Sequence, residues 1–174
     1  MKKQGFTLIE LMVVIVIMGI LAAVAVPKLF GMIAKSKASE IGPAAGEYIK
    51  LQDAYVSETG LYVGTWSTIG YTMNGETPAF KYEDVLSVPQ NKVSTDIPTT
   101  AGKAWKATAK VGLNECDKGS TWVLYLSTGA NGNGLTWGAG VKDATSGEAA
   151  VLDMDDACSV LTPQFVNFRT QSGS

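Results

Sequence analysis

The sequence has no histidine, only two cysteines and no long run of basic residues. Without histidine the chain lacks the commonest general base and a leading metal ligand, so no Ser/His or Cys/His catalytic pair can form. The aromatic residues are scattered and not interleaved with Lys or Arg, and the formal net charge is −2, so nothing favours nucleic-acid binding. Carboxylate-based or lysine-based enzymes remain the alternative, and the sequence predicts a protein that is not an enzyme, with no cofactor and no nucleic-acid partner implied.

Apolar residues, by contrast, are plentiful and concentrated at one end. The 174-residue chain is 46% hydrophobic, which suits one compact domain, or one domain plus an appendage. From Phe6 to Val26 the only polar side chains are Thr7 and Glu10. A helix rising ~1.5 Å per residue over this stretch spans about 30 Å, the thickness of a bilayer core. This segment is predicted to cross a membrane.

The carboxylate of Glu10 needs an explanation, because an ionisable group inside a membrane helix costs on the order of 3 kcal/mol. A removable secretory signal, cleaved after the small-x-small sequence Ala23-Val24-Ala25, leaves it unexplained. If the chain were instead cut between Gly5 and Phe6, a new α-amino group would lie four positions before Glu10, with a pKa of about 8. In staggered neighbouring helices, one chain's amine can then meet another chain's carboxylate and fix the axial offset.

The stretch "KKQGFTLIELMVVIVIMGILAAVAVPKL" closely resembles the leader and N-terminal helix of type IV pilins and pseudopilins. The resemblance implies that a membrane prepilin peptidase cuts after Gly5 and methylates Phe6, and that Glu10 is needed for assembly. The match covers about the first thirty residues and extends more loosely to about residue 62, where "QDAYVSETGLY" is similar to the end of the family's helix. Beyond that point no motif matches.

The predicted fold is α+β, with one long N-terminal helix packed on a small antiparallel β-sheet. Its predicted parts are a leader over residues 1–5, a transmembrane or filament-core helix over 6–30, an amphipathic half of the same helix over 31–59, and a globular sheet domain over 60–174.

The second half of the helix is amphipathic. Its apolar stripe is Ala34, Ile41, Ala44, Tyr48, Leu51 and Tyr55, and its opposite side carries Lys35, Glu40, Glu47, Lys50 and Asp53. The helix is predicted to end near Thr59 with Gly60 as its cap. Bends are predicted at Pro27 and Pro43, because each proline removes a donor and clashes with the preceding turn. For the segment from Gly19 to Pro27, the resemblance implies unwinding on assembly.

The remainder reads as strands and loops. Alternating residues predict strands at 105–113, 121–127 and 135–141, the last two joined by an Asn-Gly-rich hairpin at 128–134. Residues 79–86 are ambiguous between strand and helix, and 64–78 and 87–103 are predicted to be surface loops. The helix is expected to pack on the resulting antiparallel meander.

Three sets of side chains are candidates for a covalent link, a metal site or catalysis. Cys116 and Cys158 are predicted to form a disulfide if the chain is exported, worth roughly 4 kcal/mol, the alternative being buried thiols. Asp153, Asp155 and Asp156 are the calcium candidates, since major pseudopilins carry such a site, but their spacing fits no EF-hand and clustered acids are usually solvated. Glu83 and Asp84 are not expected to act as a catalytic pair, because adjacent strand residues point to opposite faces.

By this resemblance, the expected function is that of a major pilin: a structural subunit of a type IV pilus-like filament serving adhesion, motility or uptake. The precursor would be a single-pass bacterial inner-membrane protein, with the prepilin peptidase and the pilus assembly platform as partners. The mature subunit would form a homo-polymer on the cell surface. The alternatives are a pseudopilin of a type II secretion system and a minor or tip pilin.

Overall fold

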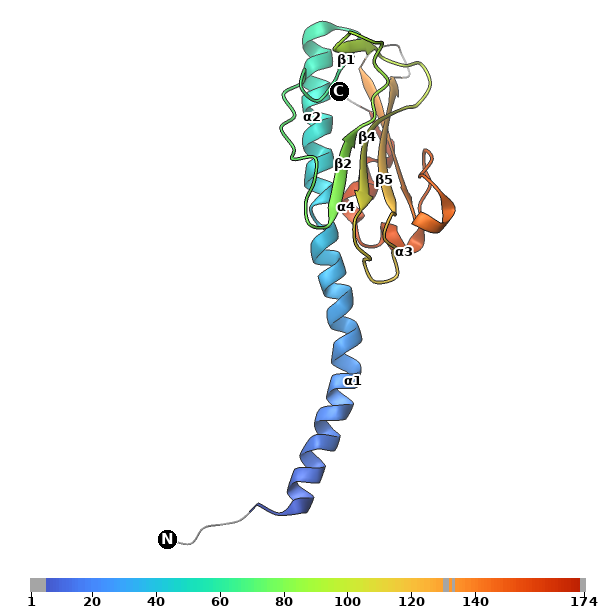
Figure 1. The fold of residues 1–174 in the computed structure, drawn as a ribbon. Coiled ribbons are helices and arrows are strands. Elements are labelled where there is room, and N and C mark those ends of the chain that lie inside the picture. The colour runs from blue at the N-terminus through green and yellow to red at the C-terminus, as the bar shows by residue number, and fades with distance from the viewer. Residues whose placement is uncertain (1–5, 130–131, 133, 173–174) are drawn as a thin grey trace.

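The computed structural model describes residues 6–129, 132 and 134–172. A long helical rod carries a β-sheet beside its upper half (Figure 1), which confirms the α+β prediction. The helices are α1 (Leu8–Ala38), α2 (Ile41–Thr59), α3 (Asp156–Ser159) and α4 (Pro163–Val166), with 3-10 turns η1 (Ala144–Ser146) and η2 (Asn167–Thr170). The strands are β1 (Tyr62–Gly64), β2 (Phe80–Asp84), β3 (Ser94–Asp96), β4 (Gly102–Ala109), β5 (Thr121–Thr128), β6 (Leu135–Lys142) and β7 (Gln171–Ser172).

The main sheet has the strand order β2-β4-β5-β6-β7, with every neighbouring pair antiparallel. The predicted meander is confirmed in β4, β5 and β6, although β4 ends at Ala109 and the chain then turns through a bridge between Leu113 and Cys116. Of the predicted hairpin, Asn131 and Asn133 lie outside the described residues. Gly132 and Gly134 adopt φ values of 74° and 69°, the positive angles that such a connection requires.

Two sequence interpretations need adjustment. The ambiguous segment 79–86 contains β2, and the segment 87–103, expected to be a loop, contains β3 and the start of β4. Strand β3 pairs with β1 in a separate two-stranded sheet, from Tyr62 opposite Asp96 to Gly64 opposite Ser94. Its Ser-Thr-Asp sequence lacks apolar alternation, so strand patterning could not reveal it.

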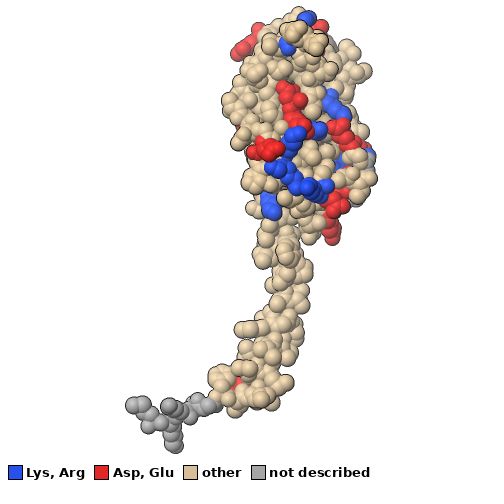
Figure 2. Space-filling model, in the orientation of Figure 1, with Lys and Arg blue, Asp and Glu red and all other residues tan. Residues whose placement is uncertain are grey.

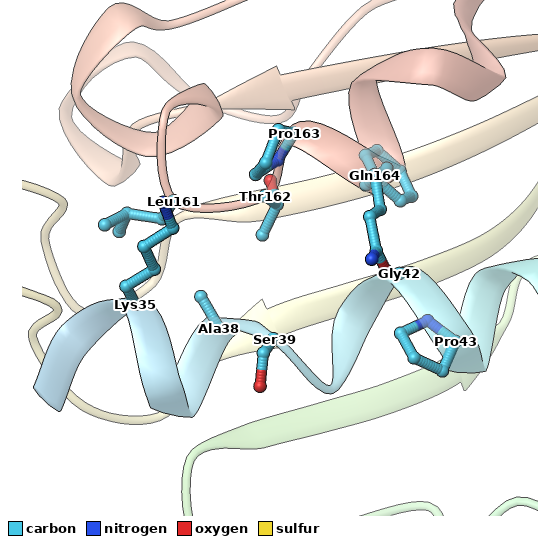
Figure 3. A pocket seen from close by; sticks show the side chains of 10 residues that line it. Lys35, Ala38, Ser39, Gly42, Pro43, Leu161, Thr162, Pro163 and Gln164 are labelled. Carbon is cyan, nitrogen blue, oxygen red and sulfur yellow. The ribbon is translucent and has the colours of Figure 1, made fainter. Parts of the chain in front are cut away.

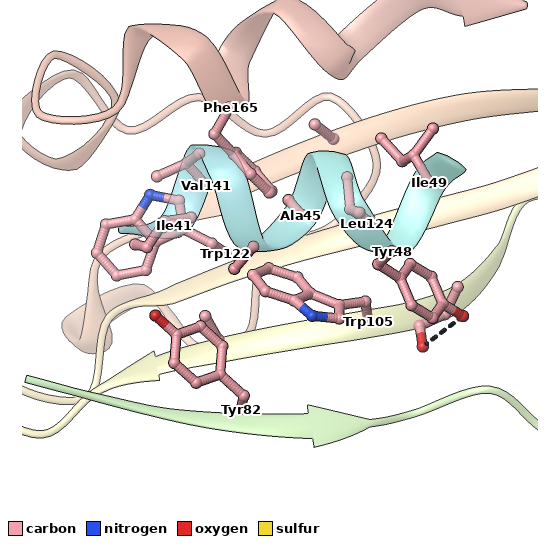
Figure 4. Packing of buried hydrophobic residues seen from close by; sticks show 14 of the residues in the cluster. Ile41, Ala45, Tyr48, Ile49, Tyr82, Trp105, Trp122, Leu124, Val141 and Phe165 are labelled. Atoms are coloured by element: carbon pink, nitrogen blue, oxygen red, sulfur yellow. Dashed lines mark hydrogen bonds between the residues drawn. The ribbon is translucent and has the colours of Figure 1, made fainter. Parts of the chain in front are cut away.

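The core lies between α2 and the sheet and is rich in aromatic rings (Figure 4). The ring of Tyr48 meets Trp137 edge-on, with centroids 6.0 Å apart, and Trp105 packs against Phe165 at 6.1 Å. The Tyr48 hydroxyl donates to the Ala104 carbonyl over 3.3 Å. Hydrogen bonding at the ring edges lets these large side chains be buried without orphaned polar groups.

The buried face of α2 differs from the predicted stripe. Leu51 and Tyr55 are only half-buried, whereas Gln52 and Val56 are buried. The Gln52 amide donates to the Gly64 carbonyl over 2.6 Å and accepts from the Gly64 N–H over 3.2 Å, which ties β1 to the helix. Asp53, expected in water, is half-buried and accepts the indole N–H of Trp137 over 3.1 Å. In this part of α2, the buried face is therefore shifted by one residue from the predicted stripe.

The two prolines have different effects. α1 continues through Pro27 as one helix, which curves gently in Figure 1. Pro43 has no N–H for the carbonyl of Ser39, and the helix is interrupted there by a two-residue turn at Ser39 and Glu40. The second bend thus lies four residues before Pro43. α2 ends at Thr59 with Gly60 at φ 93°, which confirms the predicted cap.

Candidate assembly site at the start of the helix

Thr7 and Glu10 together cap the start of α1. The Thr7 backbone N–H and hydroxyl both donate to Glu10 Oε2, over 2.9 and 2.6 Å, and the Glu10 N–H lies 3.4 Å from Thr7 Oγ1. This reciprocal arrangement is a capping box, and a carboxylate at this position also suits the positive end of the helix dipole. The carboxylate therefore has a local role that the sequence interpretation missed. The Thr-x-x-Glu spacing could have indicated it.

Glu10 is surrounded by apolar side chains. Together with Phe6, Ile9, Val13 and Val14 it lines a groove of about 400 Å³. Only one of its carboxylate oxygens, Oε2, has a hydrogen-bond partner among the described residues. The other oxygen is available to an external cation.

Residues 6–33, here called the stalk, comprise most of α1 and bury no side chain against the rest of the subunit that the structure describes. Its large apolar side chains are exposed, from Phe6 at 80% to Ile33 at 43%, and the first buried helix residue is Ala34. On the face that Figure 2 shows, this stalk is almost free of charge, whereas basic and acidic side chains gather over the globular part. The helix is long and apolar enough to cross a membrane.

The other predicted residues of this region are placed as follows. Gly5 lies outside the described residues, so the Gly5–Phe6 junction is not seen in full. Gly19 and Pro27 lie within continuous α1, and a Cβ at Gly19 would meet no atom within 4 Å. The proposed unwinding between them concerns assembly and stays a prediction.

A pocket of about 290 Å³ lies beside the helix interruption (Figure 3). Lys35, Ala38 and Pro43 line it from the helix, and Thr162 to Phe165 line it from the C-terminal segment. Lys35 is its only charged lining residue. The pocket holds no pair of titratable groups that could act as acid and base.

Cys116 and Cys158 form a disulfide, with Cα atoms 5.0 Å apart and 42 positions between them in sequence. The bond joins the loop after β4 to α3 and so attaches the C-terminal segment to the sheet. Asp143 lies beside the two sulfurs. Sulfurs joined to each other cannot serve as thiolate ligands, so this group does not constitute a metal site.

The acidic candidates have structural partners. Asp153 Oδ2 accepts from the Ala150 N–H at 2.8 Å and from Lys142 Nζ at 3.2 Å. Asp155 Oδ1 accepts from the N–H groups of Ala157 and Cys158, which caps α3. The side chain of Asp156 lies outside the described residues. These contacts occupy one oxygen of each described carboxylate, and the expectation that the cluster is solvated and holds no calcium stays a prediction.

Glu83 and Asp84 have separate surroundings. Hydrogen bonds from Lys81 and Lys106 hold the pKa of Glu83 below its usual value. Burial raises the pKa of Asp84, although the N–H groups of Trp66 and Leu86 donate to its two oxygens. These partners occupy each carboxylate, and the two do not form an acid–base pair.

The structure is thus that of an α+β protein with one capped apolar helix, left uncovered by the described part of its own subunit and long and apolar enough to anchor it in a membrane. Comparisons with known proteins identify its family. Residues 1–26 match the prokaryotic N-terminal methylation motif.

Several curated relatives extend beyond this motif. The chain is 33% identical over 137 residues to the fimbrial protein EcpC of Eikenella corrodens, covering 78% of this chain and 80% of that protein. It is 40% identical over 101 residues to the type IV major pilin protein PilA of Myxococcus xanthus (strain DK1622), covering 58% and 46%. It is also 28% identical over 106 residues to the type IV wide pilus major component PilA4 of Thermus thermophilus, covering 61% and 81%.

The chain belongs to the type IV pilin superfamily. Its match spans less than half of the Myxococcus protein, so that protein's whole activity is not transferred to it.

Proposed function

We propose that this chain is the major subunit of a type IV pilus-like surface filament and acts as a structural protein, not as an enzyme. The observation that carries the proposal is the uncovered apolar surface of the stalk, from Phe6 to Ile33. Burying apolar surface is favourable by roughly 25 cal/mol per Å². We therefore expect this surface to be covered by lipid before assembly and by other copies of α1 afterwards. Such burial supplies the cohesion of the polymer.

The proposed maturation follows from the order of segments. Residues 1–5 act as a leader, 6–30 form the membrane and filament-core helix, 31–59 its amphipathic half, and 60–174 the outward domain. The prepilin peptidase cuts the inner-membrane precursor between Gly5 and Phe6 and methylates Phe6, and the assembly platform then extracts the subunit. The match of residues 1–26 to the methylation motif supports this step.

Glu10 sets the offset between neighbouring helices in this proposal. The new amine of Phe6 in one copy meets the carboxylate of Glu10 in another, and the pair neutralises two charges that apolar surroundings disfavour separately. Oε2 remains with Thr7, and Oε1 is the oxygen left for the amine. Loosening of the helix between Gly19 and Pro27 would let the cores pack, since Pro27 supplies no backbone donor.

Adhesion, motility and uptake are all compatible with such a filament. A pseudopilin of a type II secretion system, or a minor tip subunit, would share the same N-terminus. The similarity to EcpC continues well into the globular domain, and the relatives named above are major pilins or fimbrial proteins, which favours the pilus. Long surface fibres made mainly of this chain would agree with a pilus, and short membrane-confined fibres with secretion.

The mass and terminal sequence of the mature protein test the processing. We expect a chain that begins at N-methylated Phe6. A chain that begins at Val26 would identify the segment before it as an ordinary secretory signal and would overturn the proposal.

A pair of substitutions at Glu10 separates its charge from its capping role. Glu10→Gln keeps an oxygen that can accept from Thr7 but removes the charge, and Glu10→Val removes both. We expect both variants to insert and be processed, with sheared-fibre yield reduced at least about tenfold, as expected for a lost buried ion pair. Thr7→Ala, which weakens the cap and keeps the charge, is the control with near-normal yield. Normal fibres from Glu10→Gln would show that the charge is not needed.

A further inference from the structure

The exposed charges of α1 and α2 form no ion pair within the part of the subunit that the structure describes. The ion pairs found there join sheet and loop residues, such as Lys106 with Glu83 and Lys110 with Glu76. None of these ion pairs involves a residue of α1 or α2. Lys28 and Lys35 on α1, and Glu47 and Glu58 on α2, are exposed.

These four charges form two stripes of opposite sign. Lys28 and Lys35 are two helical turns apart and share a face, and Glu47 and Glu58 are three turns apart and share a face. The basic stripe lies below the helix interruption and the acidic stripe above it. Lys37 lies on the opposite side of α1 from Lys28, and Lys50 lies to one side of the acidic stripe.

A second parallel copy in register would place lysine beside lysine. An axial displacement removes this repulsion. Lys28 and Glu47 are 19 positions apart and Lys35 and Glu58 are 23 apart, so a displacement of 21 positions, about 31 Å, brings both pairs within two positions. The remaining mismatch is about 3 Å, which the long lysine side chain spans.

We propose that Lys28 and Lys35 of one copy pair with Glu47 and Glu58 of a parallel second copy displaced by about 31 Å along the helix axis. This inference rests on the proposed filament and concerns a different neighbour from the one whose Phe6 amine meets Glu10, because that contact needs a displacement of only four positions, about 6 Å. The occupant is a second copy because the stripes are complementary in sign, and because Lys28 adjoins the apolar surface that polymerisation covers. Such pairs fix register and exclude wrong alignments more than they add affinity.

Charge exchange in the full-length chain tests the pairs. Lys35→Glu and Glu58→Lys should each lower sheared-fibre yield about tenfold relative to membrane-held subunit, since like charges then face each other. The double variant carries both exchanges in every copy and should recover to within about twofold of the parent. Lys28→Glu, Glu47→Lys and their double variant repeat the test on the other pair. Lys92→Glu, an exposed loop lysine, is the matched control and should assemble normally.

Each remaining outcome contradicts the pairing. Single variants that assemble like the parent, or double variants no better than the weaker single variant, would overturn it. If the lysine variants no longer accumulate in the membrane, these lysines bind lipid headgroups instead of a second copy. If the parent assembles but the charge exchanges have no effect, the proposed charge pairs are refuted and the proposed function is not. A parent that forms no fibre would overturn the proposed function as well.

Discussion

At the scale of single residues, Asp143 shows how a buried carboxylate organises two loops. Oδ1 accepts from the N–H and hydroxyl of Thr145, and Oδ2 accepts from the Asp117 N–H at 2.9 Å and from the Ser120 hydroxyl at 3.2 Å. The residue is only 8% exposed and lies against the disulfide. It thus joins the loop before β5 to the turn after β6, a role that no sequence pattern indicated.

Asp143 should make stability depend on acid pH. The N–H groups of Thr145 and Asp117 hold the pKa of Asp143 below its usual value. A lowered folded-state pKa means that the stabilisation is present above the unfolded value of about 3.9 and is lost as pH falls through the folded value. Asp143→Asn loses at least one of these charge-assisted bonds, so it should cost about 1–3 kcal/mol at pH 7.

The measurement is the melting temperature of the full chain in detergent at pH 7 and at pH 3. The gap between parent and Asp143→Asn should narrow at pH 3, because the parent has then lost part of the same stabilisation. Asp96→Asn is the control, since Asp96 is exposed on β3. An equal gap at both pH values would assign the effect to packing alone.

At the scale of elements, the segment after η1 crosses the outer face of β6 at Ala149 and Ala150 and then pairs with the edge of β6 through backbone hydrogen bonds. The Leu152 N–H donates to the Ala139 carbonyl, and the Val141 N–H donates to the Asp153 carbonyl over 2.7 Å. This close approach requires glycine on β6, because a Cβ at Gly140 would lie 2.1 Å from the Ala150 carbonyl oxygen. Gly140 is therefore required for packing, because any side chain at this position would clash with the backbone of Ala150.

Gly140→Ala should displace this segment. Overpacking against backbone costs about 3 kcal/mol, which corresponds to a fall in melting temperature of roughly 6–12 °C. The amides of Leu152 and Asp155 should also exchange faster with solvent, since both donate to β6 carbonyls. Gly112→Ala is the matched control, because its Cβ would meet nothing within 4 Å. Equal melting temperatures for the two variants would contradict this packing.

Sequence patterns predicted the elements that rest on periodicity and missed those that rest on tertiary contact. The apolar run fixes α1, and alternation fixes β4, β5 and β6, because each buries one continuous surface. β3 forms only because β1 lies beside it, and the contact between Asp53 and Trp137 depends on how the sheet sits on α2. At the candidate site, the lone charge at Glu10 was visible in the sequence. The exact position of the helix interruption before Pro43 was not, since proline acts on the carbonyl four residues earlier.

At the scale of the whole molecule, the subunit has two parts: an apolar stalk that needs an apolar environment and a globular part that has its own core. Residues 6–33 are covered by nothing described in the subunit, and the core begins at Ala34. The core contacts of α2 with the sheet, and the disulfide between Cys116 and Cys158, lie entirely within the second part. The fold of the globular part should therefore not depend on the stalk.

A chain consisting of residues 34–174 tests this independence. We expect it to dissolve without detergent, to elute as a monomer and to melt within a few degrees of the full chain, because no core contact is removed. The full chain should require detergent or polymerise, since its stalk exposes an apolar surface of a size that monomeric soluble proteins rarely show. Gel filtration and circular dichroism measure both properties. If this fragment aggregates or loses its cooperative transition, the stalk stabilises the domain. The division between stalk and core would then be wrong.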